Sequence, residues 1–263
     1  MKILNRNNIF KKIYDYRELL KNNVKKDIRG RYKQSLLGVI WTFLNPLLQL
    51  AVYAFIFPLI LKTTQPYYVI FVCVGLIPWT FFTATISQST WAVVGNANIV
   101  KKVYFPREIL PISIVTSNMV NFLISTIIII TFCLIYGLGI TKYLIFYPLI
   151  LIIQYIFQLG ISFIFSAITV YFRDLEHFVQ IAIMLLFYAT PIVYAGDTIP
   201  EAFSFIIELN PMAHIINAYR DIFYNQTMPD FMSLAIVFVF SIILLIVGYF
   251  IFEKLQKGFA EEL

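Results

Sequence analysis

The sequence predicts an all-α integral membrane protein with six transmembrane helices. Of its 263 residues, 60% are hydrophobic and only 13% are charged, whereas soluble domains carry about 25% charged residues. A soluble fold of this length has too little interior to bury so much apolar surface. The apolar runs are about 20 residues or longer and do not alternate in polarity, which excludes membrane barrel strands. Helices satisfy their own backbone polar groups in hydrocarbon, so they are the expected form.

Six apolar runs are assigned as spans on this criterion. They cover, in order, Gly38 to Leu61, Tyr67 to Trp91, Pro111 to Tyr136, Tyr143 to Tyr171, Phe178 to Tyr194 and Phe231 to Phe252. We therefore expect one transmembrane domain over residues 38–252. It is preceded by a cytoplasmic interfacial segment, residues 1–37, and followed by a short cytoplasmic tail, residues 253–263.

Lysine and arginine are distributed unevenly between the connecting segments. Seventeen of the 20 precede the first span, follow the second or fourth span, or lie in the tail. Only Lys62, Lys142 and Arg220 fall on the opposite side. Because cytoplasmic loops carry the excess of Lys and Arg, this pattern places both termini in the cytoplasm. The net charge of +6 is thus a topology signal, and no basic face remains to bind nucleic acid.

The segment before the first span predicts an amphipathic helix that lies in the cytoplasmic membrane interface. Its apolar residues recur three or four positions apart with lysines between them, at Ile9, Ile13, Tyr16, Leu20, Val24 and Ile28. Anionic lipid headgroups attract such lysines. A helix that packs against its own bundle has the same pattern and is compatible with the interfacial position.

The loop after the second span predicts a short cytoplasmic helix. Pro106 and Pro111 end it, and Asn96 or Asn98 suits the N-cap position. A brief amphipathic helix that stands off the bilayer is suited to docking in a groove of a cytoplasmic partner. The alternative is a loop whose charges only set the topology. The candidate docking residues are Asn96, Asn98, Val100, Lys101, Lys102, Val103, Tyr104 and Phe105.

The segment from Gly196 to Asp230, between the fifth and sixth spans, is too long for a tight turn and mixes acidic with apolar residues. Pro200 and Pro211 each suit the first turn of a helix. Two interpretations remain open. The segment forms a short helical hairpin that dips into the outer interface or re-enters the bundle, or it is an external loop with helical turns.

Motifs for catalysis are absent from the sequence. It contains no G-x-x-x-x-G-K-[ST], G-x-S-x-G, H-E-x-x-H or paired Cys-x-x-Cys pattern. Cys73 and Cys133 lie in apolar runs and are interpreted as small core residues, and His177 and His214 as surface or interface residues. The span centres hold no Asp, Glu, Lys or Arg, which argues against ion-coupled transport and embedded acid–base chemistry. We therefore expect no catalytic residue and no metal site.

Aromatic and small polar residues occupy the spans instead, with 26 Phe, 17 Tyr and 3 Trp in the chain. Sugar rings stack on aromatic faces, and amide groups hydrogen-bond to sugar hydroxyls. A glycan path would use Trp41, Asn45, Gln49, Tyr53, Trp79, Phe82, Asn118 and Asn121, with Ser125 as a further candidate. Membrane-belt anchoring explains each aromatic residue equally, and interhelical hydrogen bonding is favoured for any single polar one.

Several short motifs, in order along nearly the whole chain, resemble those of one family. They are Arg17–Leu20 (RELL), Lys26-Asp27, Arg31–Gly38 (RYKQSLLG), Trp41, Asn45–Leu47 (NPL), Val100–Pro111 (VKKVYFPREILP), Phe172–Glu176 (FRDLE), Pro191–Tyr194 (PIVY), and Asn210-Pro211 followed by Tyr219-Arg220. Together they are similar to ABC-2 type permeases, within the branch that exports lipid-linked O-antigen, teichoic acid and capsular polysaccharide.

This resemblance implies a transport subunit and not an enzyme. It implies a homodimer in the bacterial cytoplasmic membrane that works with two separate ATPase subunits. Those partners would hold ATP and magnesium, and this chain would hold no cofactor. Nucleotide binding would push the helix at Asn96 to Phe105 and open a path for lipid-linked polysaccharide at the dimer interface.

The resemblance also assigns roles to two groups of residues. Arg29, Arg31 and Lys33 would contact the carrier lipid's pyrophosphate, although positive-inside topology explains them too. Asn210, Pro211, Tyr219 and Arg220 would form an external gate. Two alternatives remain: an ABC-2 permease for another lipid or a drug, and a membrane-embedded transferase acting on lipid-linked sugars. The transferase would use Asp174, Glu176 or Asp221 as its acid or base.

Overall fold

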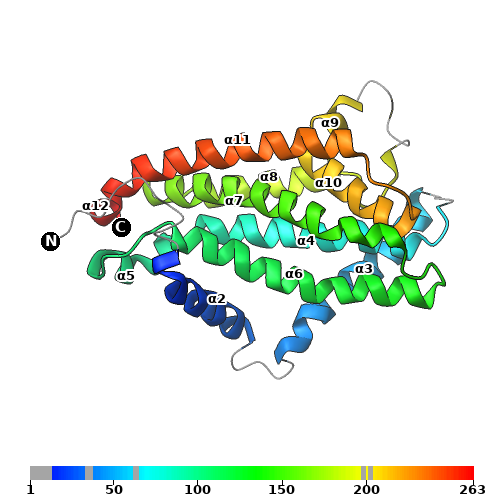
Figure 1. Cartoon of the computed structure of the whole chain (residues 1–263), viewed down its shortest axis with the longest axis horizontal. Coiled ribbons are helices and arrows are strands. Elements are labelled where there is room, and N and C mark those ends of the chain that lie inside the picture. Colours follow the sequence, from blue (N-terminus) through cyan, green and yellow to red (C-terminus); the bar gives the residue numbers. More distant parts are fainter. Residues whose placement is uncertain (1–13, 33–37, 62–64, 197–199, 201–203) are drawn as a thin grey trace.

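The computed structural model describes residues 14–32, 38–61, 65–196, 200 and 204–263, and every regular element within them is a helix. The all-α class is therefore confirmed. Five helices in the described residues are long and apolar enough to cross a membrane. They are α3 (Trp41–Leu61), α4 (Tyr68–Thr90), α6 (Ile109–Ile135), α7 (Tyr147–Tyr171) with its preceding turn η3 (Lys142–Phe146), and α11 (Phe231–Leu255). They form one elongated bundle (Figure 1).

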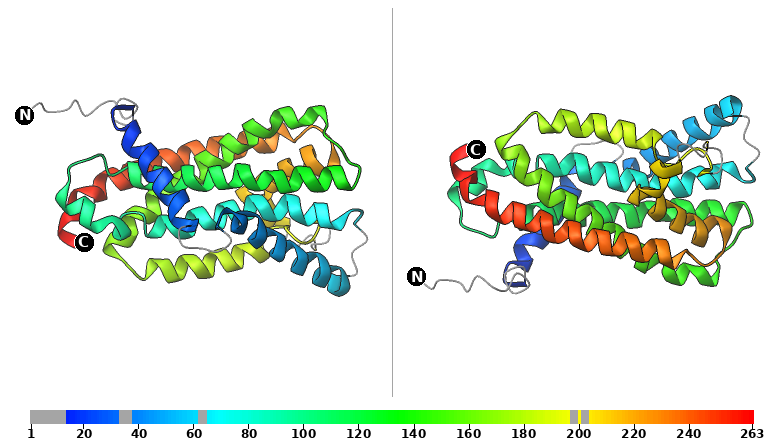
Figure 2. Two further views of the ribbon diagram at one scale, coloured as in Figure 1. Left: turned by 90° about the horizontal axis from the view of Figure 1, so that it is seen from below. Right: turned by 90° about the horizontal axis from the view of Figure 1, so that it is seen from above.

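Shorter elements lie at the two ends of this bundle (Figure 1). One end carries α5 (Ala97–Lys102) and α12 (Phe259–Glu262), and α2 (Arg17–Tyr32) crosses α6 obliquely nearby (Figure 2). The other end carries α9 (Ser204–Glu208), α10 (Pro211–Arg220) and the π-helical turn η6 (Asp221–Asn225). The short turns η1 (Gly38–Ile40), η2 (Val94–Asn96) and η7 (Gln256–Gly258) precede α3, α5 and α12.

Helix α4 is the centre of the bundle. Within its most apolar stretch 78% of the residues are buried, compared with 6% in α3 and 22% in α11. It packs against α3, α6, α7, α8 (Leu175–Tyr188) and α10. Helices α3 and α11 therefore form outer sides of the chain, and most of their apolar surface is left for lipid or for another protein.

The backbones of α7 and α11 approach each other closely at two glycines. A Cβ atom added to Gly160 would lie 2.8 Å from the backbone nitrogen of Leu245, and one added to Gly248 would collide with the carbonyl oxygen of Gly160. Within a membrane, dispersion contacts and not the hydrophobic effect hold helices together, so small residues that allow close backbone contact stabilise the pair.

The C-terminal end of the predicted fifth span, Phe178 to Tyr194, was placed too late in the sequence. Helix α8 has 14 residues and stops at Tyr188, so it is about 21 Å long, shorter than the roughly 30 Å of membrane hydrocarbon. From Thr190 to Ala195 the chain is not helical. Pro191 explains the stop, because proline lacks an N–H group and pushes the preceding residue out of the helical region. A sixth crossing that includes α8 stays a prediction.

The non-helical stretch after α8 receives hydrogen bonds from distant side chains. The Tyr68 hydroxyl donates to the carbonyl oxygen of Val193 over 2.6 Å. The Arg220 Nη2 atom donates to the carbonyl oxygen of Ile192 over 2.8 Å. Because a buried carbonyl group without a partner is costly, these donors allow the helix to end inside the protein.

Helix α10 packs inside the bundle, with seven of its ten residues buried against α4, α7 and α11. Two interpretations were open for the segment from Gly196 to Asp230. The position of α10 within the bundle agrees with the one in which a short helix re-enters it. Pro211 is its first residue, as predicted, and Asn210 is its N-cap, whose side-chain oxygen accepts from Met212 N over 3.0 Å. The Asn210 amide also donates to Thr190 Oγ1 over 2.8 Å, which ties α10 to the end of α8.

We predict that Gly248→Val lowers the thermal stability of the purified protein. The new side chain would run into the backbone of Gly160, which moves only with α7, and overpacking of this kind costs about 1–3 kcal/mol. The measurement is the temperature at which the protein in detergent loses its monodisperse elution. Gly30→Val is the matched control, because no atom lies within 4 Å of a Cβ at that position. Equal stability of the two variants would contradict the close contact.

We predict that Arg220→Met loosens the attachment of α10. The Ile192 carbonyl would lose its donor, which costs about 1–3 kcal/mol locally. Removal of the buried guanidinium also removes its desolvation cost, which offsets the lost hydrogen bond in the global free energy of unfolding. Local hydrogen–deuterium exchange is therefore the better measurement. Amides of α10 should exchange about fivefold faster or more. Arg173→Met, at an exposed arginine, should leave them unchanged, and equal exchange in the two variants would exclude this contact as the anchor.

Candidate functional site

Two adjoining cavities form a groove along α3. The first, about 350 Å³, lies between α3, α4 and α6, and the second, about 380 Å³, lies between α3, α4 and α8. They share Asn45, Pro46, Thr80 and Ala84, so we call them together the polar groove. Its polar lining residues are Trp41, Thr42, Asn45, Gln49, Thr80, Thr83, Ser87, Asn118, Asn121, Ser125 and Gln180.

The polar groove brings together most of the residues predicted for a glycan path. Asn45 and Gln49 are one turn apart on α3, so they share one face, and both are exposed. Asn118, Asn121 and Ser125 are three and four positions apart and share a face of α6 in the same way. The groove thus gathers amide side chains from two helices that are mostly apolar.

The polar side of α3 is not suited to contact with lipid. Leu48 and Val52 on the same helix are each about half exposed, as expected for a lipid-facing or protein-facing surface. Exposed amide groups such as those of Asn45 and Gln49 are costly in hydrocarbon, and in membrane proteins they face water or other protein. The groove therefore has the chemistry of a water-accessible surface inside a membrane domain.

The three other predicted path residues pack elsewhere. Tyr53 lies against Phe187, with ring centres 5.5 Å apart. Trp79 contacts Phe82 at 5.3 Å, and Phe82 stacks on Phe157 at 6.0 Å. These rings belong to the main apolar core of the chain and do not line the polar groove.

The four residues predicted for an external gate lie together at α10. Asn210 and Pro211 begin the helix, and Tyr219 and Arg220 end it. Tyr219 is fully buried and donates to Gln154 Oε1 over 3.0 Å. The Arg220 guanidinium lies over an aromatic ring of α4, 3.7 Å from its centre, which is an attractive cation–π contact.

A pocket of about 360 Å³ lies beside this arginine, lined mainly by α10, η6 and the start of α11. Burial raises the pKa of Asp221, while hydrogen bonds led by the Ser233 hydroxyl hold the pKa of Asp230 below its usual value. Asp230 also accepts from the backbone amides of Met232 and Ser233, so it caps α11. Both acids therefore have structural partners.

Helix α5 has one buried side and one exposed side. Val100 and Phe105 are buried, whereas Asn98, Lys101, Lys102 and Val103 are exposed. Tyr104 is 89% exposed, an unusual position for so large a ring. Asn96 occupies the N-cap position, but its side chain donates back to the Ala92 carbonyl over 2.9 Å and accepts no capping bond. These exposed residues belong to α5 and the loop after it, at one end of the bundle (Figure 1).

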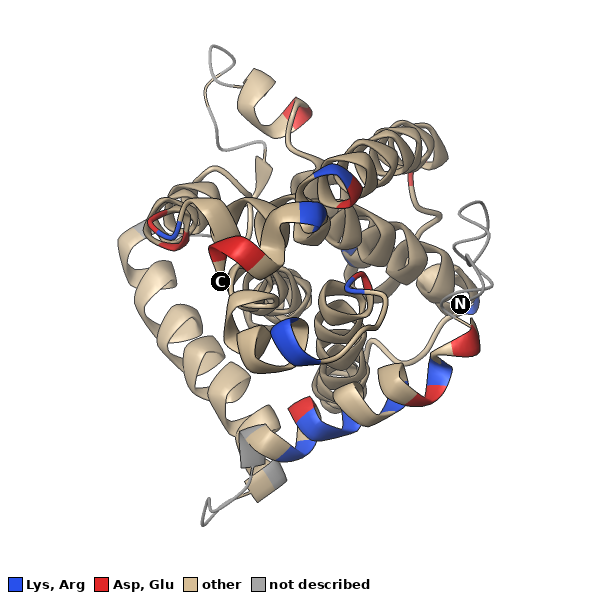
Figure 3. Ribbon diagram, turned by 90° about the vertical axis from the view of Figure 1, so that its left-hand side faces the viewer, with Lys and Arg blue, Asp and Glu red and all other residues tan. Residues whose placement is uncertain are grey.

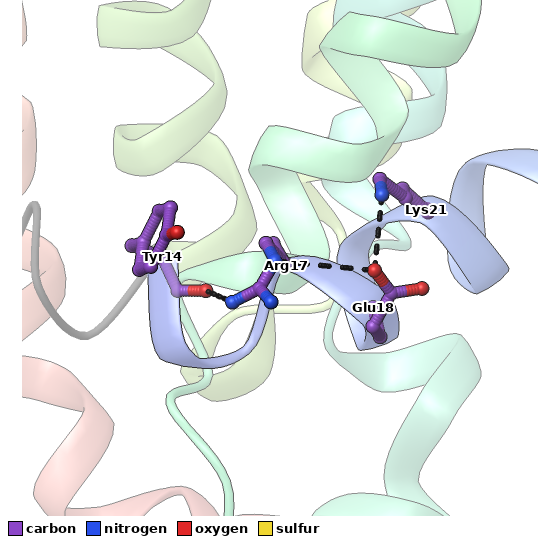
Figure 4. A network of polar contacts seen from close by, with 4 residues as sticks. All are labelled: Tyr14, Arg17, Glu18 and Lys21. Atoms are coloured by element: carbon purple, nitrogen blue, oxygen red, sulfur yellow. Dashed lines mark hydrogen bonds and ion pairs between the residues drawn. The ribbon is translucent and has the colours of Figure 1, made fainter.

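Helix α2 presents a basic surface near the same end (Figure 3). Lys21 donates to Glu18 over 2.9 Å, and Arg17 lies 4.0 Å from the same carboxylate (Figure 4). The bond from Lys21 lowers the pKa of Glu18. Arg29 is exposed and lines a cleft of about 420 Å³ between α2 and α6. The Arg31 side chain and Lys33 lie outside the described residues.

Several residues that hold α10 in place were not predicted from the sequence. Thr190, Ile192, Tyr68 and Gln154 hold α10 and the end of α8 through hydrogen bonds. The proline at position 191 was the only local signal, and it indicates where the helix stops but not which side chains meet it. Across the described ranges, no group of three or more His, Cys, Asp or Glu is placed to hold a metal ion.

Comparisons with known proteins identify the family. The family model described as "ABC-2 type transporter" matches residues 18–224. The chain is 43% identical to an O-antigen export system permease protein, RfbA, of Klebsiella pneumoniae, over 93% of this chain and 94% of that protein. It is 35% identical to a protein of the same name from Myxococcus xanthus, over 97% and 99% of the two chains.

A more distant relative is the polysialic acid transport protein KpsM of Escherichia coli, 24% identical over 89% of this chain and 92% of that protein. The family match covers most of the bundle, including α3 to α10 and the polar groove. A multi-pass membrane protein with several long apolar helices is consistent with it. The chain belongs to the ABC-2 type transporter family.

Proposed function

We propose that this chain is the permease subunit of an ABC exporter that moves a lipid-linked polysaccharide, of O-antigen, teichoic acid or capsule type, across the bacterial cytoplasmic membrane. The polar groove is the observation that carries the proposal. It places amide and hydroxyl groups of α3, α4 and α6 on a surface of an apolar bundle, where they would hydrogen-bond to sugar hydroxyls. The names of the relatives support the same class of substrate.

The energy for export comes from separate ATPase subunits, which hold ATP and magnesium. Two of them serve a permease homodimer, and each docks on the exposed side of α5. Tyr104 and Val103, at 89% and 57% exposure, supply the apolar contacts, and Lys101 and Lys102 supply charge. ATP binding shifts the permease between two conformations because the ATPase pair has a different affinity for each.

A second copy of this chain covers the polar groove across α3. With only 6% of its apolar stretch buried, α3 has most of its surface free for this contact, and amide groups in the groove then face a path between the two copies and not lipid. Asn210, Pro211, Tyr219 and Arg220, at the two ends of α10, form the external gate of this path, and the support for it is that α10 packs directly against α4, which lines the groove.

The chain is oriented with both termini in the cytoplasm, where Arg29, Arg31 and Lys33 meet the pyrophosphate of the carrier lipid. The exposure of Arg29 on α2 supports this contact, because a guanidinium group binds phosphate oxygens through paired hydrogen bonds. The α2 helix lies along the cytoplasmic interface, where membrane lipids surround its lysines.

Two other functions are less well supported. A permease for another lipid or a drug would use the same coupling but would not need a groove lined with amides. A membrane-embedded transferase would need a free acid or base. None of the three candidate acids, Asp174, Glu176 and Asp221, lines the polar groove, and Asp221 accepts a hydrogen bond from Asn225 over 3.0 Å.

We predict that Tyr104→Ala weakens binding of the ATPase subunit. The variant removes the most exposed ring of the proposed docking surface, and loss of a buried aromatic anchor costs about 2 kcal/mol or more at an interface. Recovery of the ATPase with tagged permease should fall about 30-fold at limiting concentration. Tyr136→Ala, at the other end of α6 and 39% exposed, is the control. Full ATPase recovery with Tyr104→Ala would rule out this surface as the dock.

We predict that Asn45→Leu combined with Gln49→Leu reduces export without harming assembly. Both side chains are exposed in the groove, so apolar replacements remove hydrogen bonds to sugar but do not disturb the core. Surface polysaccharide of cells that carry only the variant should fall about tenfold, as expected when polar contacts to a substrate are lost. Thr131→Val, an exposed polar position on α6 outside the groove, is the control. Normal export by the double variant would refute the glycan path.

A further inference from the structure

A second apolar cluster, separate from the main core, lies at the α5 end of the bundle. It joins Val100 of α5 and Phe105 of the following loop to Phe163 of α7, Phe252 of α11 and Phe259 of α12. Three parts of the chain that are far apart in sequence, the α5 region, α7 and the segment from α11 to α12, thus meet in one buried contact. We call this cluster the α5 cluster.

Phe259 is the central ring of the α5 cluster. It is fully buried, and its ring centre lies 5.5 Å from that of Phe252 and 6.3 Å from that of Tyr171. The guanidinium of Arg107, in the loop after α5, lies 5.8 Å from the centre of the same ring. One side chain therefore contacts the α5 loop, α7 and α11 together.

Hydrogen bonds hold the residues just before Phe259 to the loop after α5 and to α7. Arg107 donates to the backbone oxygen of Gln256, and the Gln256 amide donates to Glu108 Oε1 over 3.2 Å. The Tyr171 hydroxyl, at the end of α7, donates to the Leu255 carbonyl over 2.7 Å. The residues after α11 therefore do not extend freely from the bundle. They fold back over the end of α7 and against α5.

Helix α5 depends on such contacts for its position. It has six residues, and Val100 is the only one that is buried. An isolated helix of this length is not stable in water, so packing must hold it in place. Helix α12 supplies part of that packing, since α5 and α12 are in direct contact.

We propose that Phe259 is a positioning residue for transport, which connects α5 to α7 and α11 so that a displacement of α5 moves both helices. The proposal rests on the proposed docking of ATPase subunits at α5. The close contact at Gly160 and Gly248 joins α7 to α11, so the two helices receive the displacement as one unit. Without the Phe259 ring, the ATPase subunits displace α5, but α7 and α11 do not move with it.

The test compares Phe259→Ala with Phe250→Ala in the complete permease–ATPase complex. Phe250 is a ring on α11 that is 63% exposed and lies outside the cluster. Two quantities are measured: ATP hydrolysis by the purified complex, and the polysaccharide that cells bearing only that variant display per complex. For Phe259→Ala we expect normal ATPase recovery, ATP hydrolysis within about twofold of the original, and about fivefold less polysaccharide or lower, the lower end of typical coupling between sites.

A conservative variant tests whether buried packing at position 259 is what connects α5 to the two helices. Phe259→Leu restores much of the buried volume and should recover most of the displayed polysaccharide. If Phe259→Ala does not assemble, Arg107→Ala replaces it, because this change cuts the tie to Gln256 and leaves the buried rings in place. The same loss of polysaccharide with ATP hydrolysis retained is then expected.

Two results would overturn the proposal. One is displayed polysaccharide for Phe259→Ala equal to that for Phe250→Ala, and the other is normal display by Arg107→Ala in the case where it is needed. Failure of the proposed function looks different. If the proposed function is wrong, the Tyr104→Ala variant keeps both ATPase binding and export, whatever amount of polysaccharide the Phe259 variants display. Dependence on Tyr104 without dependence on Phe259 would reject only the positioning role.

Discussion

Hydrocarbon offers no water to a backbone N–H or C=O group, and this constraint governs the membrane-spanning part of the described chain. Long helices satisfy it with their own backbone bonds. The break after α8 satisfies it differently, because Tyr68 and Arg220 donate to the carbonyl groups of Val193 and Ile192. Irregular chain can therefore lie within the bundle where α4 and α10 supply the donors. Of these two bonds, the one from Arg220 also ties α10 to the chain after α8, in addition to the apolar packing of its seven buried residues.

The long helices could be predicted because their signal is local. The apolar runs predicted the first and last residues of α3, α4, α6, α7 and α11 to within a few positions. The end of α8 could not be placed in this way. Ile192 and Val193 continue the apolar run past Pro191, so composition favoured a longer helix. The donors that stabilise the break lie 28 and 125 residues away in the chain, and no local pattern reveals them.

The polar part of the candidate site was visible in the sequence, whereas the aromatic part was not. Amide residues three or four positions apart, such as Asn118 and Asn121, must share a helix face, and a shared polar face in an apolar helix is informative. An aromatic residue such as Trp79 gives no comparable signal in the sequence, because the same side chain suits an apolar core, a membrane belt or a sugar contact. The four-residue helix that holds Phe259 is too short to show any period, so the sequence indicated only a tail there.

Arg220 has a consequence for the order in which the protein is built. A guanidinium group on a ten-residue helix cannot enter lipid alone without a large cost in free energy. Its partners in the finished structure are a ring of α4 and the chain after α8, both of which are synthesised earlier. The two groups that receive the guanidinium are therefore present in the chain before α10 is made, whereas α11, which also packs against α10, follows later. This segment depends on its protein neighbours, while the long apolar helices can partition into the bilayer on their own.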